Sequence, residues 1–293
     1  MADAVGNKAA HEYYLDVPVK KTPFYAKGLN NTDWGMKDRL SRIFQPQSGN
    51  TVMLAFDHGY FQGPTAGLER LDVVIENICD HADVLMATRG ALRSCISPTH
   101  NKAVCLRATH DMSVLFEDLS TGSGFSVDIE DAIRMNASAI AMQCFVGAAG
   151  ERDSLENLCR AADLGYKYGI PVLGVTAVGK EMARNARYFS LACRILAENG
   201  ASFVKTYYCD DFEKVVASCP VPIVIAGGKK LPEDEALEMA YRAIASGANG
   251  VDMGRNVFQS EHPVEMLLAI RKVVHEGFNG KQAYEYFLDS INK

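Results

Sequence analysis

The stretch "PIVIAGGKKLPED", Pro222 to Asp234, contains the signals of a strand, a turn and a helix start in direct succession. Its first part, Pro222 to Ala226, is apolar without polar alternation, which is typical of a strand covered on both faces in a parallel sheet. The glycine pair that follows favours a tight turn. Proline and acidic residues then mark the first turn of a helix. The stretch therefore predicts one β–α unit.

Comparable apolar runs recur along the chain after residue 50, so the β–α unit is repeated. Eight strands that alternate with helices predict a (β/α)8 TIM barrel. The alternative, an open doubly wound sheet that binds a dinucleotide, predicts a G-x-G-x-x-G string after an early strand, and the sequence has none. The predicted strands lie at 51–56, 84–86, 104–106, 139–146, 171–175, 203–204, 222–226 and 250–253. The predicted helices between them lie at 68–80, 128–136, 154–168, 188–198, 210–217 and 232–246.

The N-terminal part of the chain lacks this repeat. Residues 1–50 show no strong periodicity and are predicted to form an extension that packs on the barrel or on a neighbouring subunit. Within the extension, residues 34–44 predict an amphipathic helix with Trp34, Leu40 and Phe44 on one face.

The barrel domain is predicted to span residues 51–293. Between 107 and 127 the sequence is rich in glycine and serine, so the helix expected there is short or replaced by a loop. Two further helices, at 263–275 and 281–292, are predicted to close or cap the barrel.

The composition of the chain argues against several classes of function. The chain of 293 residues has a formal net charge of −6, which argues against a nucleic-acid partner because such surfaces need a basic face. No apolar run approaches the roughly 18 residues of a membrane span, and no secretory signal is visible. Eight cysteines without a C-x-x-C pair predict reduced thiols in a cytoplasmic protein, with a catalytic cysteine as the alternative. The histidines show no metal-ligand spacing, so no metal is predicted.

Glycine-rich turns follow the last two predicted strands. The active site of such a barrel lies at the C-terminal ends of the strands, and the turns after strands seven and eight commonly bind phosphate. Backbone N–H groups can converge on an anion there, because glycine leaves the approach free, and arginine adds a charged donor. The predicted phosphate site consists of Gly227, Gly228, Gly254 and Arg255. The alternative is that these glycines only form tight turns.

The sixth predicted strand, "FVKTYY" at Phe203 to Tyr208, carries a lysine where burial is unfavourable for an ammonium group. One interpretation is that Lys205 lies near the strand end and extends to water. The other is that burial and nearby cations such as Arg255 favour the neutral amine, which can form an imine with a ketone. An imine promotes cleavage of the neighbouring C–C bond, so Lys205 is the predicted catalytic lysine. The competing lysines, which lie in loops where water keeps them charged, are Lys180, Lys229 and Lys230.

Further polar residues at the strand ends complete the predicted site. Asp57 and His58 end the first strand and are predicted to be catalytic. The carboxylate would bind substrate hydroxyls or move protons, and the imidazole would act as an acid or base. The alternatives are a turn cap for Asp57 and a structural hydrogen bond for His58. Thr176, Tyr207 and Lys229 are predicted to line the substrate pocket.

Four strings carry a resemblance to a known family. They are AFDHGYFQGP at 55–64, VKTYY at 204–208, IAGGKK at 225–230 and GVDMGRNVF at 250–258. Through them the chain resembles the class I aldolases of archaeal fructose-bisphosphate aldolase type. Within that superfamily it is similar to the thiolases that break down the phosphorylated quorum signal autoinducer-2. The shorter motifs D-H-G, K-T and G-R-N are common to the superfamily, and the strings around them select the thiolases.

The resemblance implies a cytoplasmic barrel that assembles as a homo-oligomer, a decamer of two pentameric rings. It places the Schiff base on Lys205 and the phosphate group on the last two loops. It implies acetyl transfer from 3-hydroxy-5-phosphonooxypentane-2,4-dione to coenzyme A, giving acetyl-CoA and dihydroxyacetone phosphate. Coenzyme A is then a co-substrate, and no bound cofactor is expected.

One departure bears on the alternatives. Archaeal-type aldolases carry a tyrosine general acid in a Y-P-R-G-like string after the fifth strand, where this chain has TAVG at 176–179. A class I aldolase acting on a ketose phosphate therefore needs another proton donor, such as His58. A third possibility is a phosphosugar sensor that uses the same glycine loops without catalysis.

Overall fold

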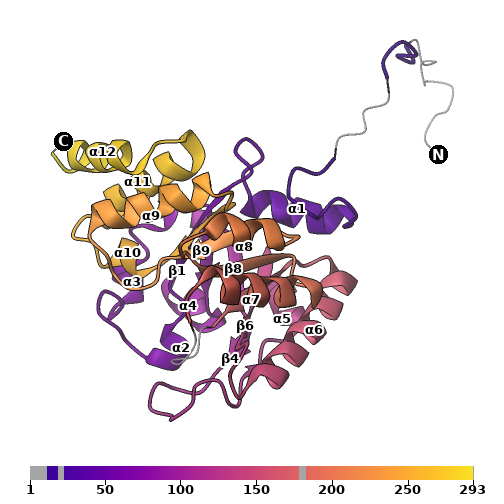
Figure 1. The fold of residues 1–293 in the computed structure, drawn as a ribbon, viewed down its shortest axis with the longest axis horizontal. Coiled ribbons are helices and arrows are strands. Elements are labelled where there is room, and N and C mark those ends of the chain that lie inside the picture. Colours follow the sequence, from indigo (N-terminus) through magenta and orange to yellow (C-terminus); the bar gives the residue numbers. More distant parts are fainter. Residues whose placement is uncertain (1–11, 19–22, 178–182, 293) are drawn as a thin grey trace, which may run out of the picture.

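The computed structural model describes residues 12–18, 23–177 and 183–292. Eight parallel strands form a closed barrel in the order β1-β10-β9-β8-β7-β6-β3-β2 (Figure 1). The predicted (β/α)8 TIM barrel and its eight predicted strands are therefore confirmed. The barrel strands are β1 (Thr51–Ala55), β2 (Val84–Ala87), β3 (Ala103–Arg107), β6 (Ala139–Cys144), β7 (Val172–Thr176), β8 (Phe203–Tyr207), β9 (Ile223–Ala226) and β10 (Gly250–Met253).

Alternate residues of each barrel strand face the barrel interior and the surrounding helices. On β8, Val204 packs in the apolar cluster that includes the outer helices, whereas Phe203 packs inside the barrel. Lys205 and Tyr207, which share the parity of Phe203, line a cavity at the end of the barrel. Asp252 takes the equivalent inward position on β10. The inward positions near the C-terminal strand ends therefore contribute to one common site.

Most of the predicted helices are present and surround the barrel, and α11 and α12 lie together beside α9 (Figure 1). Several begin at a capping side chain: Asp128, Asn185 and Asn279 each accept a hydrogen bond from a backbone N–H group of the first turn. Within the described ranges, no helix combines the length and apolarity that crossing a membrane requires. The confirmed helices are α5 (Ile129–Arg134), α6 (Glu151–Tyr168), α7 (Ala186–Glu198), α8 (Phe212–Ser218), α9 (Glu233–Ala245), α11 (Pro263–Glu276) and α12 (Gly280–Ile291).

The segment between β1 and β2 differs from the prediction. The chain does not form one helix over 68–80 but a single turn, α3 (Leu71–Val74), and a 3-10 turn, η2 (Cys79–His81). Consecutive β-branched residues at 73–75 have low helix propensity, and no side chain caps the start of α3.

Short elements after other strand ends were not predicted. The region 107–127 contains no α-helix, as expected, and instead forms a small antiparallel pair. The elements that the sequence analysis missed are α2 (Gly59–Gln62), α4 (Arg89–Cys95), η3 (Pro98–His100), β4 (Thr109–His110), β5 (Gly124–Phe125) and α10 (Arg255–Phe258).

Helix α1 (Trp34–Ile43) closes the N-terminal end of the barrel. Leu40 and Phe44 are fully buried and belong to the same apolar cluster as the inward-facing Phe203. The rings of Phe44 and Phe203 meet edge to face with 5.4 Å between their centroids. The predicted apolar face is wrong at Trp34, which is 80% exposed. Trp34 precedes Leu40 by six residues, which at 3.6 residues per turn is about 120° away around the helix.

Candidate active site

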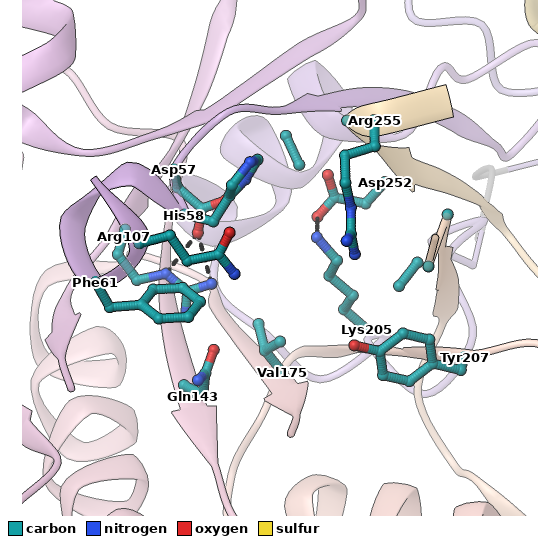
Figure 2. Close-up of a pocket in the computed structure, with 16 residues that line it drawn as sticks. Asp57, His58, Phe61, Arg107, Gln143, Val175, Lys205, Tyr207, Asp252 and Arg255 are labelled. Carbon is teal, nitrogen blue, oxygen red and sulfur yellow. Dashed lines mark hydrogen bonds and ion pairs between the residues drawn. The ribbon is translucent and has the colours of Figure 1, made fainter. Parts of the chain in front are cut away.

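A cavity of about 160 Å³ opens at the C-terminal ends of the barrel strands (Figure 2). Its walls come from seven of the eight barrel strands or from the loops that follow them. The structure brings eight of the ten predicted site residues together here. They are Asp57, His58, Lys205, Tyr207, Gly227, Gly228, Gly254 and Arg255.

The other predicted pocket residues, Thr176 and Lys229, do not line this cavity. Thr176 has the outward parity on β7, and its hydroxyl group donates a hydrogen bond to the hydroxyl group of Thr206 at 2.9 Å. Lys229 is exposed in the loop after β9. Of the remaining lysines in loops, Lys230 is held in an ion pair at the start of α9, and Lys180 lies outside the described residues.

Lys205 extends from β8 toward β10. Its side chain is 11% exposed, and its Nζ lies 2.8 Å from Oδ2 of Asp252, whose side chain is fully buried. The same Nζ lies 3.6 Å from Sδ of Met86. Burial raises the pKa of Asp252 above its usual value, although the charge of Lys205 acts in the opposite direction. The amine therefore reaches the cavity in direct contact with a carboxylate.

Asp57 and Arg107 form a buried ion pair on the opposite wall (Figure 2). Nε of Arg107 donates a hydrogen bond to Oδ2 of Asp57 at 2.7 Å, Nη2 lies 2.6 Å from the same oxygen, and both side chains are 5% exposed. Burial alone would raise the pKa of Asp57, but neighbouring positive charges, with Arg107 the strongest, hold that pKa below its usual value. The guanidinium group also lies over the ring of Tyr60, 5.6 Å from its centroid. Asp57 is thus held as a carboxylate.

His58 lies beside this ion pair, at the start of α2. Its ring stacks on Phe258 with 5.8 Å between the centroids. Its Nε2 is buried and has no hydrogen-bond partner in the part of the chain that the structure describes. Burial lowers the pKa of His58 and outweighs the opposing effect of the Asp57 carboxylate. A neutral imidazole with an unpartnered nitrogen can accept a proton from a bound molecule.

The glycine turns after β9 and β10 form a further side of the cavity. Gly228 has a φ of +68°, in the left-handed region that favours glycine. A Cβ at Gly254 would lie 2.2 Å from the carbonyl oxygen of Ala55, so glycine is needed there for β10 to approach β1. Arg255 directs its guanidinium group into the cavity near Lys205 (Figure 2). The turns therefore serve packing and also offer an anion backbone N–H groups and one cation.

Asn256 connects the two glycine turns. It is fully buried, and its Nδ2 donates to the carbonyl oxygen of Gly227 at 2.8 Å. Its Oδ1 accepts a hydrogen bond from the N–H group of Leu231 at 2.8 Å. Because one side chain on α10 binds both ends of the loop after β9, it fixes the relative position of the two turns. The sequence analysis gave Asn256 no role.

Arg107, Gln143 and Asp252 also line the cavity and were missed by the sequence analysis. Asp252 lies within a predicted strand, as Lys205 does, whereas Arg107 directly follows the predicted strand at 104–106 and is the last residue of the observed β3. The argument that a charge in a buried strand needs a reason therefore applied equally to Asp252. Gln143 is marked only as a polar residue at an inward position of β6, which is a weaker signal.

The structure bears on two further points of the sequence analysis, the alternative of a catalytic cysteine and the prediction that no metal is bound. Cys105 and Cys144 are buried, and burial raises the pKa of both thiols, which makes them poor nucleophiles. Among the described residues, no three His, Cys, Asp or Glu side chains come together as a metal site. The absence of a metal stays a prediction.

A buried lysine at the mouth of a (β/α)8 barrel, beside glycine turns suited to an anion, is the arrangement of an aldolase-type enzyme. Residues 51–260 match the family described as DeoC/LacD family aldolase. A 3-hydroxy-5-phosphonooxypentane-2,4-dione thiolase from Escherichia coli O139:H28 (strain E24377A / ETEC) is 54% identical, over 98% of this chain and 99% of that protein. The thiolase of the same name from Photorhabdus laumondii subsp. laumondii is also 54% identical over the same shares.

Solved structures agree with this fold. The crystal structure of an archaeal fructose 1,6-bisphosphate aldolase superposes with a TM-score of 0.74 at 23% identity, covering 83% of this chain and 100% of that one. A fructose-bisphosphate aldolase from Slackia heliotrinireducens gives a TM-score of 0.76 at 17% identity, covering 87% and 90%. The chain is an enzyme that belongs to the DeoC/LacD aldolase family and, within it, to the 3-hydroxy-5-phosphonooxypentane-2,4-dione thiolases.

Proposed function

We propose that this enzyme transfers an acetyl group from 3-hydroxy-5-phosphonooxypentane-2,4-dione to coenzyme A, in the breakdown of phosphorylated autoinducer-2. The products are acetyl-CoA and dihydroxyacetone phosphate. Identity of 54% to thiolases over 98% of the chain supports this reaction. The observation that carries its chemistry is Lys205, an amine that is 11% exposed in the same cavity that the glycine turns line.

The first step is imine formation on Lys205. The neutral amine attacks the ketone carbon next to the phosphorylated carbon, and the carbinolamine loses water to give a protonated imine. The phosphate group binds to the backbone N–H groups at Gly228 and Gly254 and to Arg255. Holding the phosphate there positions the ketone carbon for attack by Nζ.

The second step is cleavage of the C–C bond between the acetyl group and the hydroxyl-bearing carbon. The thiolate of coenzyme A attacks the acetyl carbonyl carbon, and the electron pair of the breaking bond moves into the imine. Acetyl-CoA leaves, and an enamine of dihydroxyacetone phosphate stays on Lys205. Protonation of the enamine carbon and hydrolysis then release dihydroxyacetone phosphate. His58 takes the thiol proton and returns it to the enamine carbon, so the proton balance closes.

Two residues on the wall opposite Lys205 have a role in this step. Arg107 and Gln143 line that wall and carry N–H groups that can donate to the acetyl oxygen as negative charge develops on it. Asp57 holds the guanidinium group of Arg107 in place through the hydrogen bond that it accepts from Nε and its ion pair with Nη2.

A class I aldolase acting on a ketose phosphate is the second candidate, because the matching family is described as aldolases. It uses the same imine on Lys205 but releases an aldehyde and needs no thiol. Its proton donor cannot be a tyrosine of the TAVG string, which has no phenol. The acceptor of the cleaved fragment therefore distinguishes the two reactions.

The test begins with imine trapping. The protein is incubated with dihydroxyacetone phosphate, reduced with borohydride and examined by intact mass and peptide mapping. We expect one adduct on Lys205, absent in Lys205→Ala and retained in Lys214→Ala, whose lysine pairs with Asp211 on the surface. Ligand binding without an adduct would overturn both enzymatic reactions and leave the phosphosugar sensor.

The acceptor is then identified with the diketone substrate. Appearance of acetyl-CoA only when coenzyme A is added supports the thiolase. Release of a carbonyl fragment without coenzyme A would support the aldolase instead.

The setting of the reaction is part of the proposal. We propose a cytoplasmic homo-oligomer, a decamer, with coenzyme A as a co-substrate and not a bound cofactor. Light scattering on the purified protein measures the assembly. A molar mass equal to the single chain of 32.0 kDa would contradict the oligomer without affecting the chemistry of Lys205.

A further inference from the structure

Asp252 differs from the other buried aspartates of the barrel in what surrounds it. Asp57 receives a hydrogen bond from Nε of Arg107 and an ion-pair contact from its Nη2. Asp83 is bound by the N–H group of Val52 and by the side chains of Arg271 and His275.

The carboxylate of Asp252 has no such set of donors. Its side chain is fully buried, and its ionic partner is Nζ of Lys205 at 2.8 Å. In the described part of the chain, neither carboxylate oxygen accepts a hydrogen bond of good geometry, and the contact with Lys205 is an ion pair.

A carboxylate kept only for structure is normally held by several donors, because burying it without them is costly. Asp57 and Asp83 follow this rule, and their pKa values lie below the usual range. Asp252 does not follow it, and burial raises its pKa. A carboxyl group in that state takes up a proton more readily than the other two. Among the described residues, the cation that contacts this carboxylate is the amine that the proposed reaction needs in neutral form.

We propose that Asp252 is a catalytic residue that moves the proton of Lys205 during imine formation. This inference rests on the proposed imine chemistry of Lys205. The ammonium group of Lys205 gives one proton to the carboxylate of Asp252, and the neutral amine attacks the ketone carbon. The nitrogen passes one proton to the new alkoxide to give a carbinolamine. Asp252 then returns its proton to the carbinolamine hydroxyl group, which leaves as water, and the protonated imine faces the regenerated carboxylate.

The position of Asp252 suits both transfers. Asp252 pairs in register with Met53 on β1 and Ala226 on β9, so two neighbouring strands fix its backbone. Its side chain points into the cavity from the strand that leads into Gly254 and Arg255 (Figure 2). A substrate phosphate on those residues would bring the ketone carbon next to Nζ of Lys205 and this carboxylate.

The rate of adduct formation tests the proposal. Wild type, Asp252→Asn and Asp252→Glu are mixed with dihydroxyacetone phosphate, quenched with borohydride at successive times and analysed by intact mass between pH 6 and pH 10. We expect Asp252→Asn to form the Lys205 adduct about a hundredfold more slowly at pH 7, the scale of general acid–base catalysis. Its rate should rise with pH, as hydroxide replaces the missing acceptor. Asp252→Glu, which keeps a carboxylate, should recover part of the rate at pH 7.

Two controls separate this proposal from the proposed function. Asp83→Asn changes a buried aspartate at the other end of the barrel and, measured below its melting temperature, should form the adduct at the wild-type rate. If wild type forms no adduct, the imine chemistry itself fails. If wild type forms the adduct and Asp252→Asn forms it with the same rate and pH profile, only the role of Asp252 is overturned.

Thermal melting shows whether each variant is folded. If neither Asp252 variant folds, the pH dependence of the wild-type trapping rate tests the proposal. Internal transfer to Asp252 predicts a trapping rate that is flat between pH 6 and pH 9. A rate that rises about tenfold per pH unit over that range would show that solvent removes the proton and would overturn the proposal.

Discussion

Arg255 and Lys229 are neighbouring cations with different positions relative to the cavity. Arg255 lines it, whereas Lys229 is exposed in the loop after β9 and does not. A charge-assisted hydrogen bond contributes about 1.5–3 kcal/mol, so we expect Arg255→Ala to raise KM for the phosphorylated substrate about ten- to a hundredfold. Lys229→Ala should change KM less than threefold in the same steady-state assay. Equal effects of the two substitutions would show that the phosphate group lies outside the turn between β10 and α10.

The protonation of His58 predicts a pH dependence. Burial holds its pKa below the usual value of about 6.5, so the imidazole is neutral at pH 7. The neutral base is lost as pH falls through that lowered pKa, so kcat/KM should decline on the acid side only below about pH 6.5. His58→Gln should remove this acid limb and lower kcat/KM by about a hundredfold or more. The control is His100→Gln, which changes a histidine that pairs with Asp80 and does not line the cavity. If kcat/KM of His58→Gln still declines at low pH, the decline is caused by the titration of another group.

Some residues of this site could be predicted from the sequence, and others could not. A charge in a predicted buried strand is a strong signal, and it identified Lys205. The same signal was present at Asp252, whereas Arg107 directly follows the predicted strand at 104–106. The ion pairs of these residues were not predictable, because Asp57 meets Arg107 across 50 residues of sequence and only the closure of the barrel brings them together. Thr176 was placed in the pocket by its position at a strand end, but strand parity turns it outward.

Among the elements, α10 has the closest connection to the site through Asn256. Asn256→Ala would leave the carbonyl oxygen of Gly227 and the N–H group of Leu231 without their partner. Each unsatisfied buried group costs about 1–3 kcal/mol, so we expect a lower melting temperature and also a higher KM for the phosphorylated substrate. Asn279→Ala is the matched control, because Asn279 caps α12 away from the cavity. It should lower stability by about 1 kcal/mol with KM unchanged. A KM that is unaffected in Asn256→Ala would mean that the turns keep their position without this side chain.

Long periodic elements were predictable, and short ones were not. The helices α6, α7, α9, α11 and α12 repeat an apolar face over three or more turns, and each was found within a few residues of its ends. The segment 68–80 has apolar residues at similar spacing, yet it forms only α3 and η2. Tertiary contacts decide the conformation of so short a segment, because an isolated helix of one or two turns is unstable. The small elements that shape the cavity mouth, α2 and α10, belong to this class.

Across the whole molecule, the two ends of the barrel carry different kinds of buried charge. At the C-terminal end, Lys205 and Asp252 contact each other with few additional donors, which suits groups that exchange a proton. At the N-terminal end, the contacts of Asp83 are complete and join the first barrel strand to the last barrel helix. The contact between Lys205 and Asp252 serves the proposed chemistry, and the contacts of Asp83 stabilise the closed barrel.

The contacts of Asp83 predict how stability depends on pH. Burial alone would raise the pKa of Asp83, but hydrogen bonds from His275 and Arg271 hold it below its usual value. Because the folded pKa is lowered, this carboxylate stabilises the fold fully above the unfolded pKa of about 3.9. That contribution is lost as pH falls through the folded pKa. Asp83→Asn should therefore lower the free energy of unfolding by about 3–5 kcal/mol at pH 7, and the difference from wild type should shrink below about pH 4.

The measurement is urea unfolding of both proteins between pH 3 and pH 7, followed by circular dichroism. Asp72→Asn is the control, because its partner Arg70 is exposed and a surface ion pair contributes about 0–1 kcal/mol. The difference in unfolding free energy between Asp83→Asn and wild type could instead stay constant down to pH 3. In that case the asparagine destabilises the fold by disturbing packing, and the charge of Asp83 does not stabilise the closed barrel. If this difference in unfolding free energy disappears at low pH, the charge of Asp83 and its contacts with Val52, Arg271 and His275 connect β1 to α11.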